Sequence, residues 1–321
     1  MGLPLVMLSL LGLLPLASDI AQAPPPPTET PVALTMVDER MTVPVQIAGA
    51  GPFRFVIDTG SERTVISRQL AGTLGLASAG DVMVVAMSGR TRVGTVIIPS
   101  LRLSSVAGIG RIQAPALDAG DLGGMGLLGI DTLQNHKVTI DLDGKAMAVS
   151  PSTKLRRTPA AAPGEIVVRA KSTLGQLIVT DASVDGRAVR VVLDTGSAVT
   201  IGNSALKRLM QRTGRFQPLT LYSATGGSVL TDYGRAGTLR LGNIQFTDMP
   251  IAFADVAPFD HFGLDRRPAL MLGMDALKKF RRVDIDFANR EARFLLPRDA
   301  STQGACRIDC GRASGAGSRL N

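Results

Sequence analysis

One short string occurs twice in this chain, and it constrains the fold more than any other feature. The first copy is FVIDTGS at Phe55–Ser61 and the second is VVLDTGS at Val191–Ser197. Each copy places an aspartate at the end of an apolar segment, where a charge is costly unless another group pairs with it. Two carboxylates placed alike in two halves of one chain indicate that Asp58 and Asp194 pair with each other.

Three further segments repeat in the same order around this string. A predicted β-hairpin with a glycine-containing turn precedes each aspartate. An apolar-apolar-Gly segment follows, at Leu127–Gly129 and Met271–Gly273. A strand ending in Ile-Asp and a return strand close each half, starting at Val138 and Val283. Four matches in one order predict a duplicated unit of about 115–135 residues.

The chain length of 321 residues favours two domains with additional terminal segments. We expect a signal peptide over 1–23, a Pro-rich leader over 24–34, lobes over 35–150 and 164–298, a linker over 151–163 and a flexible tail over 299–321. The N-terminal apolar run is short for a membrane span, and Ala21-Gln22-Ala23 is typical of a cleavage site. An uncleaved membrane anchor is the alternative, because no Lys or Arg precedes the apolar run.

Composition limits the classes of partner. Aromatic residues make up only 4% of the chain and Trp is absent, so Val, Ile and Leu must fill the cores, mostly on strands. The formal net charge is +8, but the Lys and Arg residues are scattered along the chain. Nucleic-acid binding favours a concentrated basic patch with stacking aromatics, so we expect no nucleic-acid partner. The basic surface is interpreted as solvated, or as facing anionic lipid or cell wall.

The cysteines and histidines do not form a metal-binding pattern. Cys306 and Cys310 are four residues apart near the C-terminus, where they form either a local disulfide or two free thiols. His136 and His261 are distant from them in sequence, and two thiols alone do not fill a tetrahedral metal site. We therefore expect no metal and no cofactor.

Two carboxylates brought together have a definite chemistry. Like charges at hydrogen-bonding distance cannot both ionise easily, so the pair shares one proton. The ionised member takes a proton from water, which attacks a carbonyl carbon, while the protonated member hydrogen-bonds the carbonyl oxygen. This reaction needs neither a covalent intermediate nor a metal.

The residues that follow each aspartate are expected to support the dyad. The glycines permit tight backbone turns. The threonines are expected to hydrogen-bond across the interface between the two loops, and the serines to donate to an outer carboxylate oxygen. These supporting residues are Thr59, Gly60, Ser61, Thr195, Gly196 and Ser197.

The paired motifs resemble those of aspartic proteases of the retropepsin and pepsin clan, in particular the bacterial retropepsin-like proteins. The resemblance covers about residues 35–297. It implies an all-β fold with two six-stranded, closed β-barrel lobes related by a pseudo-twofold axis, and an active site in the cleft between them. It also places each apolar-apolar-Gly segment in a buried loop beneath a catalytic turn. Asp131 and Asp275, just after these segments, are expected to be helix caps rather than catalysts.

The resemblance further implies hairpin flaps that cover the substrate. The candidates are Val82–Val96, with its tip at Met87, Ser88 and Gly89, and Leu219–Leu230, with its tip at Ala224, Thr225 and Gly226. Glycine at a flap tip suits a mobile lid. The first flap lacks the Tyr that pepsin carries there, and Tyr222 lies at the base of the second. Glu62 follows the first motif where Ala198 follows the second. A carboxylate there either shifts the pKa of the dyad or points to solvent, and we expect it to point to solvent.

The predicted function is an exported aspartic endopeptidase, periplasmic or secreted, that acts on a peptide or protein substrate. The alternative is a non-catalytic peptide-binding or envelope-scaffold protein that retains the fold. Retention of both aspartates argues against it, because a pure binder need not bury two like charges. A homodimer that pairs repeats between chains is a further possibility. However, the linker lets the two halves meet within one chain, so we expect a monomer with no stable membrane insertion after signal removal.

Overall fold

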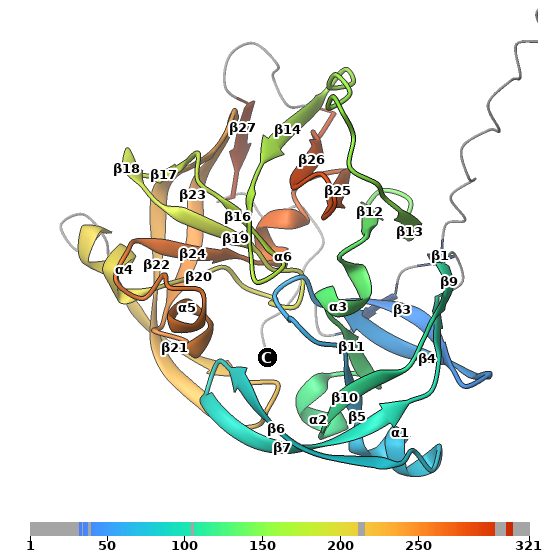
Figure 1. Cartoon of the computed structure of the whole chain (residues 1–321). Helices are drawn as coiled ribbons and strands as arrows, with labels where there is room; N and C mark the ends of the chain where they lie inside the picture. Colours follow the sequence, from blue (N-terminus) through green and yellow to red (C-terminus); the bar gives the residue numbers. More distant parts are fainter. Residues whose placement is uncertain are drawn as a thin grey trace, which may run out of the picture.

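The computed structural model describes residues 32–33, 35–37, 40–103, 106–210, 216–298 and 306–310. The signal peptide expected over 1–23 lies outside these residues, as do most of the Pro-rich leader and of the tail. Strands account for most of the regular structure, and they form two lobes that lie side by side (Figure 1). The all-β, two-lobed architecture is therefore confirmed.

The N-terminal lobe is built on a mixed ten-stranded sheet. The strand order is β6-β7-β10-β5-β11-β4-β3-β8-β9, and β2 pairs with β3. The last three residues of β4 are buried where the strand enters the core, whereas its first three residues are half-buried or exposed. The strands are β2 Thr35–Val37, β3 Arg40–Ile47, β4 Ala50–Ile57, β5 Val65–Ser67, β6 Ser78–Ala86, β7 Gly89–Ile98, β8 Leu101–Leu103, β9 Val106–Ile109, β10 Ile112–Leu117 and β11 Gly126–Leu128.

The C-terminal lobe has an eleven-stranded sheet with the order β15-β16-β19-β24-β20-β23-β22-β17-β18 and two strands, β21 and β27, off this path. Asp185 and Gly186 form the turn between β17 and β18, and both have positive φ, as a two-residue hairpin of this type requires. The strands are β15 Lys171–Thr173, β16 Gln176–Val179, β17 Ala182–Val184, β18 Arg187–Ala188, β19 Arg190–Leu193, β20 Ile201–Gly202, β21 Gln217–Tyr222, β22 Ser228–Leu241, β23 Ile244–Phe253, β24 Ala269–Leu272 and β27 Cys306–Asp309.

A third sheet of six strands joins the lobes, with the order β1-β13-β12-β25-β26-β14. The hairpins that close each half pair with each other here, because β12 and β25 are antiparallel neighbours. The expectation of six strands per lobe was wrong, since the closing hairpins belong to a shared sheet and each lobe has its own larger one. The strands are β1 Val32–Ala33, β12 His136–Asp141, β13 Ala146–Pro151, β14 Glu165–Arg169, β25 Arg282–Asp286 and β26 Glu291–Leu295.

Part of the expected flexible tail is regular structure. Strand β27 runs parallel to β23, with Ile308 opposite Phe246. Ile308 is buried in the main core, which anchors this segment to the C-terminal lobe. Cys310 is a free, half-buried thiol, and burial raises its pKa to about 11.

Six short helices complete the described elements. They are α1 Arg68–Thr73, α2 Ala119–Leu122, α3 Ile130–Leu133, α4 Ser204–Met210, α5 Ala257–His261 and α6 Met274–Leu277. Ser67 caps α1 by accepting a hydrogen bond from the Leu70 N–H. No helix in the described ranges has the length and apolarity needed to cross a membrane.

The hydrophobic core continues from one lobe into the other. Its largest cluster includes Phe55 and Leu128 of the N-terminal lobe together with Phe246 and Leu272 of the C-terminal lobe. Two smaller clusters lie apart from it, one in each lobe. A shared core and a shared sheet hold the two lobes as one unit, so the two Asp-Thr-Gly-Ser segments meet in a defined position.

The shared sheet also carries a buried network of ion pairs. Arg293 contacts Glu165 at 3.0 Å and Glu291 at 2.9 Å, while Arg282 contacts Glu165 at 3.3 Å and Asp284 at 3.2 Å. The side chains of Glu165 and Glu291 are only 5% and 4% exposed. Carboxylates this deeply buried depend on their arginine partners to remain ionised.

Candidate active site

Both predicted catalytic aspartates lie at the ends of corresponding strands. Asp58 follows β4, and its N–H donates to the Leu128 carbonyl of the neighbouring parallel strand β11 at 3.0 Å. Asp194 follows β19, and its N–H donates to the Leu272 carbonyl of β24 at 3.0 Å. The apolar-apolar-Gly segments thus lie beside the catalytic strands and fix the point where each strand ends.

The two catalytic turns are tied together across the lobes by their threonines. The Thr59 N–H donates to Thr195 Oγ1 and the Thr195 N–H to Thr59 Oγ1, each at 3.1 Å. The Thr59 hydroxyl donates to the Leu193 carbonyl at 2.9 Å, and the Thr195 hydroxyl to the Ile57 carbonyl at 2.8 Å. Both threonines are buried, so water does not compete for these four hydrogen bonds. The bonds therefore set the spacing between the two turns.

Each carboxylate lies against the glycine of the opposite turn. The Gly60 N–H donates to Asp58 Oδ1 at 2.9 Å, and the Gly196 N–H donates to Asp194 Oδ1 at 3.0 Å. A Cβ placed on Gly60 would lie 2.6 Å from Asp194 Oδ1, and one on Gly196 would lie 2.4 Å from Asp58 Oδ1. The two carboxylates therefore face each other across the interface. Asp194 is buried and Asp58 is half-buried.

These contacts predict that Gly196→Ala inactivates the site. The added methyl would overlap the Asp58 carboxyl group, and displacing a catalytic group by about 1 Å costs on the order of a hundredfold in rate. Gly72→Ala is the matched control, because a Cβ there meets no atom within 4 Å. The measurement is the catalytic activity of both variants relative to wild type, and equal values for the two variants would contradict the prediction.

The two serines of the motifs have a different role from the one expected. Ser61 Oγ donates to the Arg63 carbonyl at 2.8 Å, and Ser197 Oγ donates to the Val199 carbonyl at 2.7 Å. A hydroxyl has one proton to donate, so neither serine gives it to a catalytic carboxylate. The serines close the loop that follows each catalytic turn.

Asp131 and Asp275 are structural, but they are not the helix caps that the sequence predicted. Glycines occupy the N-cap positions of α3 and α6, and the aspartates lie in the first turn. Asp131 accepts bonds from the Thr64 N–H at 2.9 Å and the Thr64 hydroxyl at 2.7 Å. Asp275 does the same with Thr200, at 2.9 and 2.6 Å. Burial raises the pKa of Asp275, and the Thr200 hydrogen bonds oppose that rise.

Two contacts of the first catalytic loop were not predicted from the sequence. Gln176, at the start of β16, is fully buried and its Nε2 donates to the Gly60 carbonyl at 3.0 Å. Glu62, expected to point to solvent, is partly exposed and also contacts His261 Nε2 of α5 at 2.7 Å. Both contacts cross between lobes, so no local pattern in the sequence could have revealed them.

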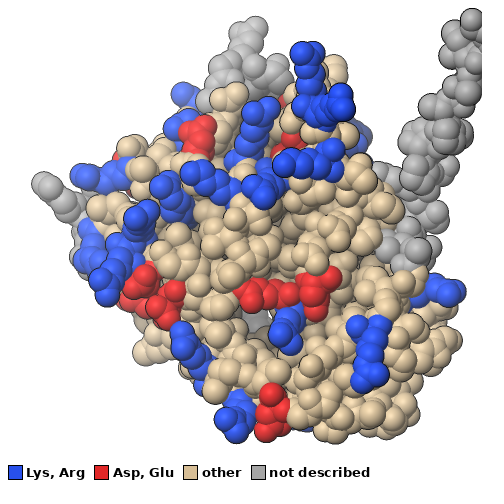
Figure 2. Space-filling view, viewed as in Figure 1, with Lys and Arg blue, Asp and Glu red and all other residues tan. Residues whose placement is uncertain are grey.

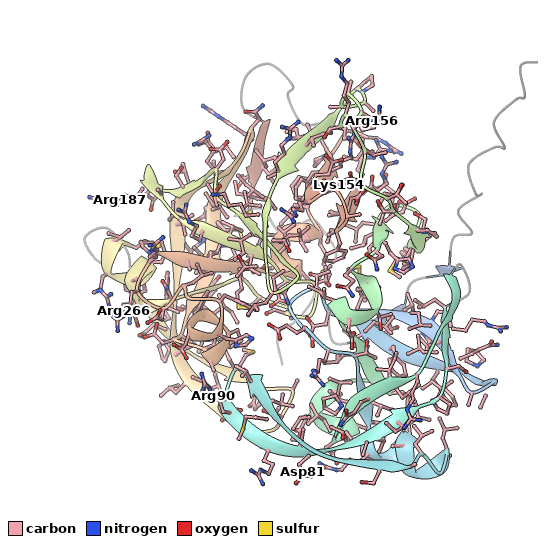
Figure 3. All side chains as sticks on the ribbon, in the orientation of Figure 1. Asp81, Arg90, Lys154, Arg156, Arg187 and Arg266 are labelled. Atoms are coloured by element: carbon pink, nitrogen blue, oxygen red, sulfur yellow. The ribbon has the colours of Figure 1, made fainter. Side chains whose placement is uncertain are left out.

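The two predicted flap hairpins are present, and their tips meet. Hairpin β6–β7 turns at Met87 and Ser88, and hairpin β21–β22 turns at 223–227. Ser88 Oγ lies 3.1 Å from the hydroxyl of Ser223 and 3.1 Å from that of Thr225. Arg90, at the end of the first hairpin where it nears the C-terminal lobe (Figure 3), pairs with Asp260 of α5 at 3.1 Å.

Each flap tip also packs against the opposite lobe. Met87 packs on the apolar cluster of the C-terminal lobe, and Ala224 packs on the small cluster of the N-terminal lobe. A Cβ placed on Gly226 would lie 3.0 Å from Asp121 Oδ2 of α2. Gly89 and Gly226 both have positive φ, which shows why glycine stands at these tips.

Comparison with known protein families agrees with this geometry. The family model described as aspartyl protease matches residues 43–132 and 180–276, which together exceed half of the chain. The chain belongs to the aspartyl protease family. Each matched segment of this aspartyl protease contains one Asp-Thr-Gly-Ser motif and one apolar-apolar-Gly segment. A comparison with curated proteins found no significant match.

Proposed function

We propose that this aspartyl protease is an endopeptidase whose Asp58 and Asp194 carboxylates share one proton and activate a water between them. The observation that supports this most directly is that each of the two carboxylates lies against the glycine of the turn in the other lobe. Four threonine hydrogen bonds hold that arrangement in place before any substrate arrives.

The reaction follows from this arrangement. The ionised carboxylate accepts a proton from the water, whose oxygen attacks the peptide carbonyl carbon. The protonated carboxylic acid donates a hydrogen bond to the carbonyl oxygen, where negative charge develops. Proton transfer to the amide nitrogen then allows the C–N bond to break, and the two products leave with the dyad again holding one proton.

The hairpin flaps are proposed to cover the substrate. In the arrangement described here their tips are linked by hydroxyl contacts of 3.1 Å, which are weak enough to break when a chain enters. Residues at these tips that would contact substrate are Met87, Ser88, Gly89, Ala224, Thr225 and Gly226. A non-catalytic role as a binding or scaffold protein is not favoured, because both carboxylates and their backbone donors are intact.

We further propose that the protein acts outside the cytoplasm as a monomer that arose by duplication of one unit. The N-terminal apolar run and its small-x-small pattern support export. The four matched segments support the duplication. A single chain supplies both aspartates, so no second copy is needed to complete the dyad.

The proposed function is tested by incubating the purified protein with an unstructured protein between about pH 3 and 7. We expect new peptide termini, with one ¹⁸O atom from labelled water in each new carboxyl group. Activity should survive a chelator and a thiol reagent, because neither a metal nor a cysteine takes part in the reaction. Absence of cleavage across the whole range, or loss of activity with the chelator, would contradict the proposal.

A further inference from the structure

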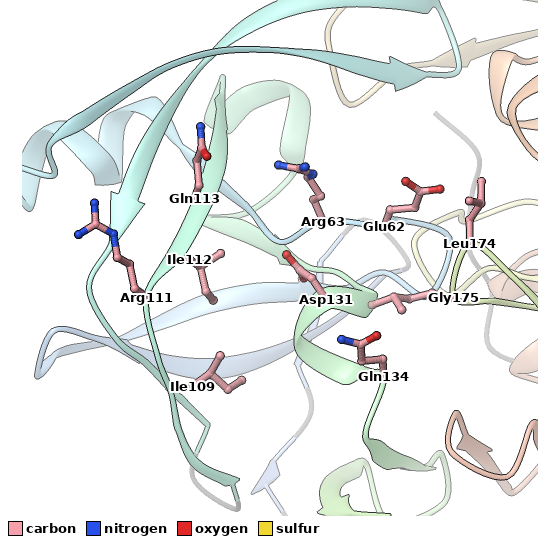
Figure 4. A pocket seen from close by; sticks show the side chains of 11 residues that line it. Glu62, Arg63, Ile109, Arg111, Ile112, Gln113, Asp131, Gln134, Leu174 and Gly175 are labelled. Atoms are coloured by element: carbon pink, nitrogen blue, oxygen red, sulfur yellow. The ribbon is translucent and has the colours of Figure 1, made fainter.

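A cavity of about 550 Å³ lies beside the first catalytic loop (Figure 4). Glu62 and Arg63, which follow the catalytic turn, form one wall, and Arg111 and Gln113 at the start of β10 form another. Leu174, from the β15–β16 turn of the C-terminal lobe, closes the side nearest the lobe interface. A peptide bound at the dyad and extending over the N-terminal lobe would pass this cavity within a few residues of the bond cleaved.

The pseudo-twofold relation provides an internal comparison for this cavity. The Ser61 hydroxyl binds the Arg63 carbonyl just as the Ser197 hydroxyl binds the Val199 carbonyl, so Arg63 and Val199 occupy corresponding positions. Val199 packs against the apolar cluster of the C-terminal lobe. The same backbone therefore presents a guanidinium at one end of the site and an aliphatic side chain at the other.

The charges that line the cavity are not equally available. Glu62 is engaged by His261, and Asp131 accepts hydrogen bonds from the Thr64 N–H and hydroxyl. By contrast, Arg63 and Arg111 are exposed and form no ion pair with any residue in the described part of the chain. The groups still free to bind a charged ligand are thus two guanidiniums, which match carboxylates in geometry.

We propose that this cavity is a specificity subsite that selects an acidic side chain, Glu or Asp, in the peptide substrate. The inference rests on the proposed endopeptidase function. The preference is one-sided, because the corresponding position around Val199 favours an apolar side chain. The net charge of +8 attracts acidic peptides in addition to this local contact, and Lys and Arg side chains cover much of the upper and left part of the face shown in Figure 2.

The test is a set of fluorogenic peptides that differ only by Glu, Gln or Lys at single positions on either side of the cleaved bond. With wild-type protein we expect one position at which Glu raises kcat/KM about tenfold over Gln, as a charge-assisted contact of this kind provides. At that position Lys should be the poorest residue. Arg63→Val, which copies the corresponding residue of the other lobe, should reduce the Glu-to-Gln ratio to below about twofold.

A charge reversal and a distant arginine make the test specific. Arg63→Glu should transfer the preference at that position from Glu to Lys. Arg187→Val is the matched control, because Arg187 is exposed at the far edge of the C-terminal lobe (Figure 3), and it should keep the wild-type ratio. Cleavage of all peptides with equal kcat/KM, or an unchanged ratio in Arg63→Val, would overturn this subsite while leaving the endopeptidase function intact. Cleavage of none of the peptides would instead count against the endopeptidase function and, with it, the subsite.

Discussion

Asp58→Asn and Asp194→Asn are each expected to lower kcat/KM for peptide hydrolysis by at least about a thousandfold. An amide can neither take a proton from the attacking water nor donate as a carboxylic acid does, and acid–base catalysis by a positioned group accounts for factors of this size. The shape of the site should survive, since the threonine bonds use other atoms. The measurement is steady-state kinetics on a peptide that wild-type protein cleaves.

Two comparisons separate catalysis from folding in this experiment. Asp181→Asn removes a carboxylate that pairs with Arg240 on the surface, far from the catalytic turns in the fold, and should retain wild-type kcat/KM. The double variant Asp58→Asn/Asp194→Asn should be no more than slightly slower than either single variant, because the two carboxylates act as one unit. If the loss of kcat/KM in the double variant equalled the product of the two single losses, the carboxylates would act independently, which would disprove the shared dyad. A single variant with near-normal kcat/KM would disprove it as well.

Arg293→Ala is expected to lower the free energy of unfolding by about 3 kcal/mol, the largest stability effect we predict. The Arg293 side chain is only 14% exposed, and its removal leaves Glu165 and Glu291, one on each side of it, buried without their main counter-ion. Removing one partner of a buried ion pair costs about 3–5 kcal/mol, and the lower end applies because Arg282 still contacts Glu165. Equilibrium urea unfolding measures the difference.

The pH dependence of this difference has a definite sign. Burial alone would raise the pKa of Glu165, but the Ala162 N–H and Arg293 together hold that pKa below its ordinary value. The pairing therefore stabilises the folded state above the pKa of the unfolded glutamate, and the stabilisation is lost as pH falls through the lower folded pKa. The stability gap between wild type and Arg293→Ala should thus narrow on acidification.

The controls for Arg293 come from the same sheet. Arg169→Ala removes an exposed arginine of β14 that lies opposite Glu291 in the strand register but takes no part in the ion pairs of the network, and it should change stability by no more than about 0.5 kcal/mol. Arg293→Lys keeps the charge but loses the planar two-pronged contact with both glutamates, so its loss should be intermediate. A variant Arg293→Ala as stable as Arg169→Ala would show that the buried network contributes little.

Features with a local signal could be predicted from the sequence. The catalytic strands, the apolar-apolar-Gly segments and both flap hairpins have apolar periodicity or glycine turns within ten or so residues. The interlobe bonds of Thr59 and Thr195 were also anticipated, because equivalent positions in two matching halves meet wherever the halves pair. In each of these cases the prediction depends on a local sequence pattern or on its repetition in the other half of the chain.

Contacts that depend on tertiary packing were missed or misassigned. Gln176 and Gly60 are 116 residues apart, and Glu62 and His261 are 199 apart. The sequence predicts a helix cap at Asp131 because its position just inside α3 satisfies that local pattern, whereas Thr64 offers it better donors from another segment. The hydroxyls of Ser61 and Ser197 were expected to donate to the aspartate carboxylates. They donate instead to backbone carbonyls two residues further along their own loops.

The amino-acid sequence by itself identified the two aspartates that we propose as the catalytic pair, since a carboxylate ending a buried strand twice in one order requires a partner. Only the tertiary structure decided how they are held, because the position of each carboxylate against the opposite glycine depends on how the lobes close. It also decided that the closing hairpins form one shared sheet, since β12 and β25 come from different halves of the chain and their pairing has no local signal in the sequence. The unequal surroundings of Arg63 and Val199 likewise come from packing, which gives two similar loops different neighbours.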